Sequence, residues 1–355
     1  MVDLYSVKQR LMHSKTGLAL PASFLFFCLL IAACTPGSDE LDSARFSGQT
    51  MGTSYHITLV ADSGDSLDTS LDGLQQAVDD ELVKINQMMS TYIPDSELMR
   101  FNRVPVDQWQ GLSEPLLEVF AISQEISEKS RGAFDITVGP LVNLWGFGPD
   151  MRPHTVPDGD ALLAAHSQVG YEYLQVDATQ ARRLRDISVD LSSVAKGYGV
   201  DWIAAFLADR GYQNYMVEIG GEVRVAGVSP RNGDWRIAVE QPSLLHEGSR
   251  LALELKNQAV ATSGDYRNYF EAEGVRFSHT IDPATGKPIT HNLVSVTVIA
   301  DTAAKADAWA TALNVMGPEK GLALANAEQL AVYMVVKTDS GFADIRSVSF
   351  SHLAP

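Results

Sequence analysis

The order of strand-like and helical segments constrains the fold of this chain more than any other feature. The apolar periodicity predicts helices at 67–89, 113–130, 158–169, 193–210 and 304–317. Alternating or continuous apolar runs predict strands at 46–61, 171–177, 182–192, 214–227, 235–242, 251–264 and 295–300. A terminal hairpin is predicted over 330–350, with its turn at Asp339-Ser340-Gly341, and the pair Gly220-Gly221 is interpreted as a strand bulge. Because strands and helices do not alternate regularly, we predict an α+β fold, a single domain of mainly antiparallel sheets packed with helices.

The first 33 residues differ from the rest of the chain. Lys8, Arg10 and Lys15 precede an apolar run that is short for a membrane span and is interrupted by Pro21. This pattern is typical of an export signal.

The export signal ends in Ile-Ala-Ala-Cys, which resembles the cleavage site of bacterial lipoproteins. We therefore predict that residues 1–33 are removed as a lipoprotein signal peptide and that Cys34 is lipidated. Residues 34–45 would then form a tether, and residues 46–355 the folded domain.

Cysteine content and charge narrow the class of protein. Both cysteines, Cys28 and Cys34, belong to the export segment or its end, so the folded part can form no disulfide. The formal net charge is -17, although the export segment is itself basic. An acidic surface repels phosphate backbones and anionic headgroups, so we expect no nucleic-acid binding and expect the lipid to provide membrane attachment.

Sequence motifs for several common sites are missing. The chain has no G-x-G-x-x-G, H-E-x-x-H, C-x-x-C or G-x-S-x-G segment. Residues 282–288 end like a phosphate loop, but the first glycine is absent and Pro288 replaces the usual Ser or Thr. These absences argue against a Rossmann domain, a zinc site and a serine hydrolase.

Two helices carry polar groups in patterns that could bind ligands. Asp307 and Thr311 are four residues apart, so they share one face of an otherwise apolar helix. They could form a local hydrogen bond or hold a metal. Lys196 lies one turn into the helix after Asp190 and Ser193, and a helix N-terminus with an adjacent lysine can bind phosphate oxygens. Ordinary capping and a solvated lysine are the alternative.

His279 precedes a turn at Asp282–Gly286. Beside a phosphate site it could act as a general base, and otherwise it would brace the turn by hydrogen bonding.

Taken together and in order, the motifs resemble those of the ApbE family, the FAD:protein FMN transferases. The stretches that carry the resemblance are MGTSY, STYIPDSEL, GAFDITVGPL, WGFG, VDLSSVAKGYGVD, GGEVRVAG, ATSGDY, HTIDPATGKP and ADAWATAL. They span about residues 46–350. The resemblance implies an ApbE-type, T-fold-like arrangement. It also implies an enzyme that uses Mg2+ to move FMN from FAD onto a Ser or Thr hydroxyl of an acceptor protein, through a phosphoester bond, with release of AMP.

The resemblance also assigns site residues. It implies that Mg2+ is bound by Asp307, Thr311 and Ser193, the last through either its hydroxyl or its carbonyl. His279 is our candidate base for the incoming hydroxyl. The FAD contacts implied by the family motifs are Met51, Tyr92, Ala133, Phe134, Asp135, Asp190, Lys196 and Ile281. Tyr92 and Phe134 are expected to offer flat apolar faces to a ring.

Two other functions remain open from the sequence. The same site could hydrolyse FAD to FMN and AMP as a pyrophosphatase, or the chain could be a periplasmic lipoprotein that only binds flavin. For the transferase, the family suggests an acceptor that is a subunit of a membrane redox complex with a Ser/Thr flavinylation motif. We therefore expect a lipid-anchored enzyme on the periplasmic side of the inner membrane.

Overall fold

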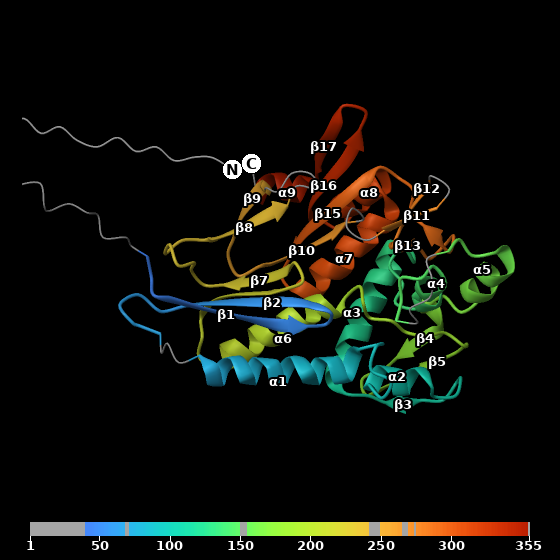
Figure 1. Ribbon diagram of the computed structural model, residues 1–355, viewed down its shortest axis with the longest axis horizontal. Helices are drawn as coiled ribbons and strands as arrows, with labels where there is room; N and C mark the ends of the chain where they lie inside the picture. Colours follow the sequence, from blue (N-terminus) through green and yellow to red (C-terminus); the bar gives the residue numbers. More distant parts are fainter. Residues whose placement is uncertain are drawn as a thin grey trace, which may run out of the picture. The chain divides into compact units, whose positions relative to one another are not determined.

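An eight-stranded antiparallel sheet runs through the folded part of the chain. Its spatial order is β1-β2-β6-β7-β10-β15-β16-β17 (Figure 1), and the strands have the following bounds: β1 Ser43–Thr50, β2 Thr53–Val60, β6 Asn214–Ile219, β7 Glu222–Ala226, β10 Ala259–Gly264, β15 Leu293–Ala300, β16 Ala331–Thr338 and β17 Gly341–Arg346. All neighbouring strands pair antiparallel. The predicted α+β fold with mainly antiparallel sheets is therefore confirmed.

The structure, a computed structural model, describes residues 40–67, 71–149, 155–240, 249–264, 269–272 and 275–353. Residues Glu40–Pro355 form one compact unit. The predicted signal peptide, Cys34 and residues 35–39 of the predicted tether lie outside the described residues. The remainder of the predicted tether belongs to the folded part: the backbone N–H of Leu41 donates to the carbonyl of Pro230, and β1 begins at Ser43. The predicted start of the folded part at residue 46 is therefore a few residues too late. None of the described helices is both long enough and apolar enough to span a membrane.

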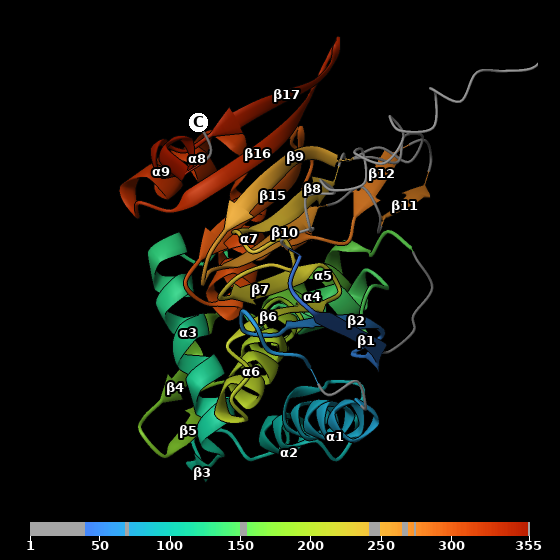
Figure 2. The same cartoon turned by 90° about the vertical axis from the view of Figure 1, so that its left-hand side faces the viewer.

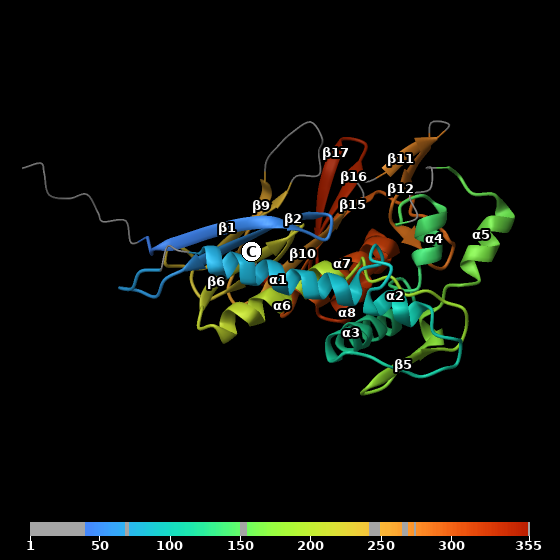
Figure 3. The same ribbon diagram turned by 60° about the horizontal axis from the view of Figure 1, so that its bottom comes forward.

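Helices cover one face of the sheet. They are α1 Asp72–Met89, α3 Glu114–Ser130, α6 Ala195–Asp209, α7 Ala303–Met316 and α8 Pro318–Ala327. α1 and α6 run along the same side of β1 and β2 (Figures 1 and 3). α7 packs against β10 and β15 and also against α6, α3 and α8. Because α7 is surrounded by other elements, most of its residues are small and buried, which lets its neighbours pack closely against it.

The opposite face of the sheet is covered by a two-stranded ribbon and a short helix. The ribbon is formed by β8 Trp235–Glu240 and β9 Ser249–Leu255, and the helix is α9 Val348–Leu353. Figure 2 shows α3 and α6 on the side of the sheet away from this ribbon. β16 packs Val332 and Met334 on the helical side and Tyr333 and Val335 on the other, as the two-residue period of a strand requires. Because both faces of β16 are buried, its sequence is a continuous apolar run instead of an alternating one.

Smaller elements surround the end of the sheet near α7. The helices are α2 Glu97–Asn102, α4 Gly139–Leu144 and α5 Gly159–His166, and a 3-10 turn, η1, spans Tyr171–Tyr173. The strands form the sheet β3-β5-β4 (β3 Gln110–Gly111, β5 Gln180–Arg183, β4 Leu174–Val176) and two hairpins, β11 Tyr269–Ala272 with β12 Val275–Ser278 and β13 Ile281–Asp282 with β14 Lys287–Pro288.

Several predicted strand boundaries are wrong. Residues 46–61 are part of a hairpin that turns at Met51-Gly52, both with positive φ, at 49° and 74°. Gly220-Gly221 is also a hairpin turn rather than a bulge, with φ of 61° and 106°. Positive φ at both central residues matches the right-handed twist of the flanking strands, and glycine adopts it without strain.

Other segments differ at their ends. The strand predicted over 182–192 stops at Arg183 in β5, and the terminal hairpin gives way to α9 after β17. Helices α2, α4, α8 and α9 were not predicted. The five predicted helices and the turn of the terminal hairpin are confirmed.

Candidate functional site

A cavity of about 400 Å³ lies where α7, the start of α6, the β6–β7 turn and the β13 segment meet. All predicted site residues within the described part of the chain line it except Met51. They are Tyr92, Ala133, Phe134, Asp135, Asp190, Ser193, Lys196, His279, Ile281, Asp307 and Thr311. The cavity therefore brings together residues from segments that are more than 200 positions apart in the sequence.

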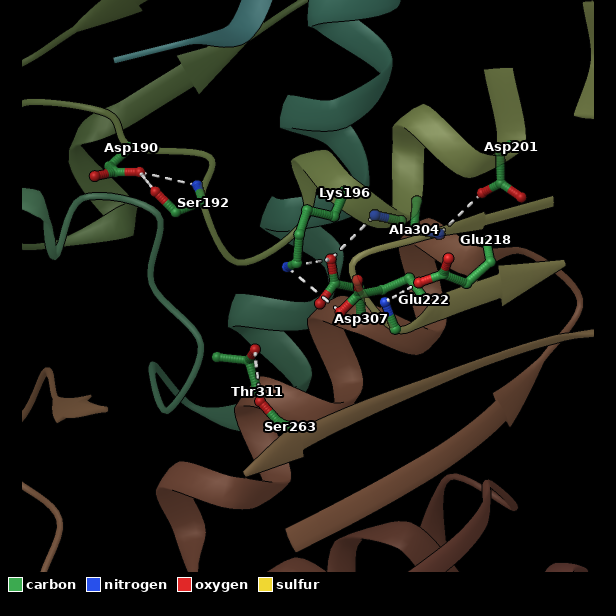
Figure 4. A network of polar contacts seen from close by, with 12 residues as sticks. Asp190, Ser192, Lys196, Asp201, Glu218, Glu222, Ser263, Ala304, Asp307 and Thr311 are labelled. Carbon is green, nitrogen blue, oxygen red and sulfur yellow. Dashed lines mark hydrogen bonds and ion pairs between the residues drawn. The ribbon is translucent and has the colours of Figure 1, made fainter. Parts of the chain in front are cut away.

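Three charged side chains form the centre of this cavity. The Nζ atom of Lys196 lies 3.4 Å from Oε1 of Glu222 and 3.6 Å from Oδ2 of Asp307 (Figure 4). Oδ2 of Asp307 also accepts a hydrogen bond of 3.1 Å from the backbone N–H of Gly197. The side chains of Glu222 and Asp307 are both buried, and the lysine is partly exposed. The ammonium group of Lys196 thus forms ion pairs with two buried carboxyl groups.

Burial changes the pKa values of these groups in a consistent way. Burial raises the pKa of Asp307 and raises that of Glu222 to about 8, although Lys196 opposes both shifts. Burial by itself would lower the pKa of Lys196, but the charges of Asp307 and Glu222 outweigh it and hold that pKa above its ordinary value. The lysine therefore stays charged, while burial favours the neutral forms of both carboxyl groups. A cation bound beside them would favour their ionised forms.

A close approach of two helices positions Asp307 beside Lys196. A Cβ atom on Gly197 would lie 2.3 Å from the carbonyl oxygen of Ala303, so α6 can come this near to α7 only with glycine here. Asp201, one turn later on α6, accepts hydrogen bonds of 3.0 and 2.9 Å from the N–H groups of Ala303 and Ala304. Arg224 of β7 pairs with the same carboxylate at 2.5 Å. Asp201 thereby caps the N-terminus of α7 from outside the helix.

Thr311 lies one turn beyond Asp307 on the same face of α7, as the four-residue spacing predicted. Its Oγ1 atom lies 3.4 Å from Oγ of Ser263 at the end of β10 (Figure 4). The alternative interpretation, a hydrogen bond between Asp307 and Thr311, does not match the structure. The carboxylate of Asp307 contacts Lys196, and the hydroxyl of Thr311 contacts Ser263. Ser193 lines the same cavity from the turn before α6.

Asp190 organises that turn. Its Oδ1 atom accepts a 2.8 Å hydrogen bond from the backbone N–H of Ser192 and a second one from the Ser192 hydroxyl. The backbone N–H of Asp190 donates to the carbonyl of Ile136 at 2.7 Å. Asp190 therefore holds the turn that carries Ser193 and Lys196 against the 133–137 segment.

The Ala133–Asp135 segment lines the cavity differently from what the sequence suggested. The Phe134 ring is 1% exposed and belongs to the main core, so it does not present an open face to a ligand ring. Both carboxylate oxygens of Asp135 accept hydrogen bonds from the protein: Oδ1 from the N–H and hydroxyl of Thr137, and Oδ2 from the N–H of Tyr171. Burial raises the pKa of Asp135. These two side chains fix the shape of the cavity wall.

Tyr92 and Met51 belong to a second cavity of about 670 Å³, which includes Ile85 and Met89 of α1. Tyr92 is 65% exposed, so its ring is open to a ligand, as expected. The two cavities share a wall formed by Tyr92, Asp190, Ser192 and Lys196. Met51 therefore sits beside the site, one cavity away from Asp307.

His279 and Ile281 enter the first cavity from the segment around β13. The His279 ring meets Phe147 edge-on, with centroids 6.3 Å apart. The Asp282–Gly286 turn that follows is braced by other side chains. Trp145 Nε1 donates to the Gly286 carbonyl and His166 Nε2 contacts the Pro283 carbonyl, both at 2.9 Å.

Glu222 is the site residue that sequence reasoning missed. It lies in the first position of β7, directly after the Gly220-Gly221 turn. A glutamate at this place in a strand pattern looks like an ordinary polar position. The one hint in the sequence is that Glu222 directly follows a glycine pair that forms a hairpin turn.

The donor set fits magnesium. Asp307, Thr311 and Ser193 offer hard oxygen atoms, and Mg2+ usually binds one or two carboxylates together with waters and substrate phosphate oxygens. Across the described ranges, no group of three or more His, Cys, Asp or Glu side chains converges. Oε2 of Glu222 is buried and has no hydrogen-bond partner among the described residues, so the cavity wall includes an acceptor that a bound group could use.

Known proteins resemble this chain over nearly its whole length. A curated FAD:protein FMN transferase from Vibrio cholerae is 45% identical over 323 residues, 91% of this chain and 95% of the relative. One from Escherichia coli K12 is 38% identical over 344 residues, 95% and 97% of the two chains.

Solved structures are similar as well. The flavin transferase ApbE from Vibrio cholerae superposes with a TM-score of 0.81 at 43% identity, over 88% of this chain and 99% of that one. The ApbE protein from Thermotoga maritima gives 0.77 at 29% identity, over 88% of this chain and all of that one. The sequence pattern of the ApbE family matches residues 51–334. On these grounds the chain belongs to the ApbE family.

Proposed function

We propose that this chain transfers FMN from FAD to a serine or threonine hydroxyl of an acceptor protein, with release of AMP and with a requirement for Mg2+. One observation carries the proposal: a single cavity collects the Lys196–Asp307–Glu222 cluster, Thr311 and His279. The names of the relatives, FAD:protein FMN transferases, support this acceptor class over water.

The shape of the site suits FAD. FAD has two ring systems joined by a pyrophosphate, and the two cavities meet at a wall that contains Lys196 and Asp190. A positive charge at the junction is where a pyrophosphate would bind, with one ring system on each side. The exposed ring of Tyr92 lies on the same shared wall and can stack on a flat ring.

In the proposed reaction, the acceptor oxygen forms a bond to the FMN phosphorus, and the bond from that phosphorus to the AMP oxygen breaks. His279 would take the proton of the acceptor hydroxyl, because such a hydroxyl is a weak nucleophile near neutral pH. Lys196 would balance the charge that develops on the departing AMP phosphate. Mg2+, when held by Asp307, Thr311 and Ser193, would draw charge from the pyrophosphate oxygens.

We further propose that the acceptor is a subunit of a membrane redox complex and that a lipid on Cys34 keeps the enzyme beside it, on the periplasmic side of the inner membrane. The sequence at residues 1–34 supports the lipid anchor. The short segment between Cys34 and β1 would hold the folded part close to the membrane surface.

The test is to incubate the purified protein with FAD, Mg2+ and a candidate acceptor, and to measure the acceptor's mass together with free AMP and FMN. We expect the acceptor to gain FMN and AMP to appear in equal amount. Free FMN with unmodified acceptor would favour the pyrophosphatase instead, and unchanged FAD would favour a flavin-binding protein.

A further inference from the structure

The protein satisfies the buried carboxyl group of Glu222 only in part. Its side chain is 5% exposed and its Oε1 atom lies 3.4 Å from the ammonium of Lys196, but among the described residues its Oε2 atom has no hydrogen-bond partner. A buried polar atom without a partner costs about 1–3 kcal/mol, so a purely structural glutamate would be expected to have found a donor. The residue also lines the proposed FAD cavity. Its free oxygen is therefore available to a group that enters the cavity.

The contacts of Lys196 suggest what that group is. The same ammonium lies 3.4 Å from Glu222 and 3.6 Å from Asp307, so the two carboxylates face a common region that already holds positive charge (Figure 4). Two carboxylates and one ammonium leave a negative charge uncompensated when both are ionised. A divalent cation on Asp307 would bring that charge and also bring bound waters, which are strong hydrogen-bond donors.

We propose that Glu222 is a positioning residue of the cation site, which accepts a hydrogen bond from a water bound to the Mg2+ on Asp307. The inference rests on the proposed magnesium site and adds a residue to it. A direct bond from Glu222 to the metal is not part of it, because the Oε1 atom of Glu222 is already paired with Lys196. Carboxylates that hold the water or the ligands of a metal typically change its affinity by roughly 10–100-fold.

The local backbone supports this assignment. Glu222 follows two glycines with positive φ, and a Cβ atom on Gly220 would lie 2.9 Å from Cγ2 of Thr53 and 3.3 Å from Cδ of Lys196. The tight turn therefore lets the β6–β7 hairpin approach Lys196 closely. Glu218, four residues earlier on the same hairpin, points elsewhere, to His56 and to the N–H of Gly221.

The experiment measures Mg2+ affinity by calorimetric titration of the purified protein without FAD, for the wild type, Glu222→Gln and Glu218→Gln. Glutamine keeps the shape of the side chain but cannot become a carboxylate when the cation binds. We expect Glu222→Gln to weaken Mg2+ binding by roughly tenfold or more and to melt within a few degrees of the wild type in EDTA. Glu218→Gln removes one charge from the same hairpin outside the cavity, and its Mg2+ affinity should be unchanged. Equal affinity of Glu222→Gln and the wild type would overturn the proposal.

A second pair of variants separates a contact to the cation's water from an effect through Lys196. In a Lys196→Met background, Glu222→Gln should still weaken Mg2+ binding if Glu222 acts on the cation's water. If the effect disappears in that background, Glu222 acts only by holding the lysine, and the proposal is wrong. If Glu222→Gln does not fold, Glu222→Asp, which keeps the charge but shortens the reach, should show an intermediate affinity. The result is independent of the acceptor, so a failure here leaves the FMN transfer assay to decide the proposed function.

Discussion

Single residues in the cavity owe their properties to the loss of water around them. Asp307 and Glu222 have raised pKa values because they are buried, and Lys196 keeps its charge because two carboxyl groups surround it. In water these three side chains would attract one another only weakly. Inside the fold, burial favours the neutral forms of Asp307 and Glu222, and a bound cation would favour their ionised forms. The chemistry of the cavity therefore depends on burial as much as on residue type.

His279→Ala tests the proposed base. We expect FMN transfer to slow by roughly 10²–10⁴-fold and its dependence on pH near neutrality to flatten, because the group that takes the proton is gone. FAD should bind with close to native affinity. Rates across a pH series, with FAD affinity from fluorescence quenching, provide the measurement. A retained pH profile would remove His279 from the mechanism.

Residue roles could be predicted from sequence only in part. The four-residue spacing predicted that Asp307 and Thr311 share one face of a helix, and the resemblance to the ApbE family assigned both of them and Lys196 to the site. The burial of the Phe134 ring could not be predicted, because whether an aromatic side chain faces a cavity or the core depends on packing that no local pattern encodes. The role of Glu222 was not predicted for a similar reason, because its neighbours in space come from α6 and α7 and not from its own strand.

At the scale of elements, the site depends on how closely α6 and α7 approach. Gly197→Ala would push a methyl group into the backbone of Ala303 and Ala304, with contacts of 2.3–2.8 Å that no side-chain rotation can relieve. We expect the free energy of unfolding to fall by roughly 1–3 kcal/mol, as for other overpacked sites, with a loss of Mg2+ affinity because Asp307 moves.

Gly73→Ala is the matched control for this substitution, since Gly73 lies in α1 and a Cβ there meets no atom within 4 Å. It should be neutral or stabilise slightly, by about 0.5–1 kcal/mol. Chemical denaturation of both variants supplies the comparison. Equal stabilities for the two would mean that the α6–α7 contact is not as tight as described.

Helices α4 and α5 stabilise the turn after Ile281. Trp145, directly after α4, and His166 of α5 form hydrogen bonds with backbone carbonyl groups of this turn. We expect His166→Ala to weaken FAD binding by roughly two- to tenfold, since one hydrogen bond is worth about 0.5–1.5 kcal/mol. The pH profile of transfer should keep its shape, unlike that of the His279 variant. The exposed His352 of α9, changed to alanine, is the control. A flattened profile for His166→Ala would contradict its role as a brace.

For the whole molecule, the class of fold followed from the order of elements, while the topology did not. The apolar period marked α1, α3, α6 and α7, and the antiparallel sheet followed from the irregular order of strands. The turns at Met51-Gly52 and Gly220-Gly221 were not predicted, because strand-like sequence continues on both sides of each turn and each region was therefore predicted as one long strand. The pairing of β7 with β10 joins segments separated by the whole β8–β9 ribbon, and sequence periodicity contains no information about such pairings.

Attachment to the membrane is also a property of the whole molecule. We expect Cys34→Ser to shift the protein from the membrane fraction to a soluble form or an unprocessed precursor, because the lipid and the cleavage site both require this thiol. Fractionation followed by mass spectrometry of the N-terminus tests it. An acylated, membrane-bound Cys34→Ser protein would refute the predicted anchor.

The central claim is that the Asp307 cavity uses Mg2+ to cleave FAD and pass FMN to a protein hydroxyl. The most direct measurement follows AMP release and protein-bound flavin together, for the wild type and Asp307→Asn, each with Mg2+ and with excess EDTA. Asparagine retains an oxygen that can accept from Gly197, so the fold should persist. We expect equal amounts of AMP and protein-bound flavin for the wild type with Mg2+ only, and loss of both for Asp307→Asn. Transfer by the variant at the wild-type rate, or by the wild type in EDTA, would contradict it.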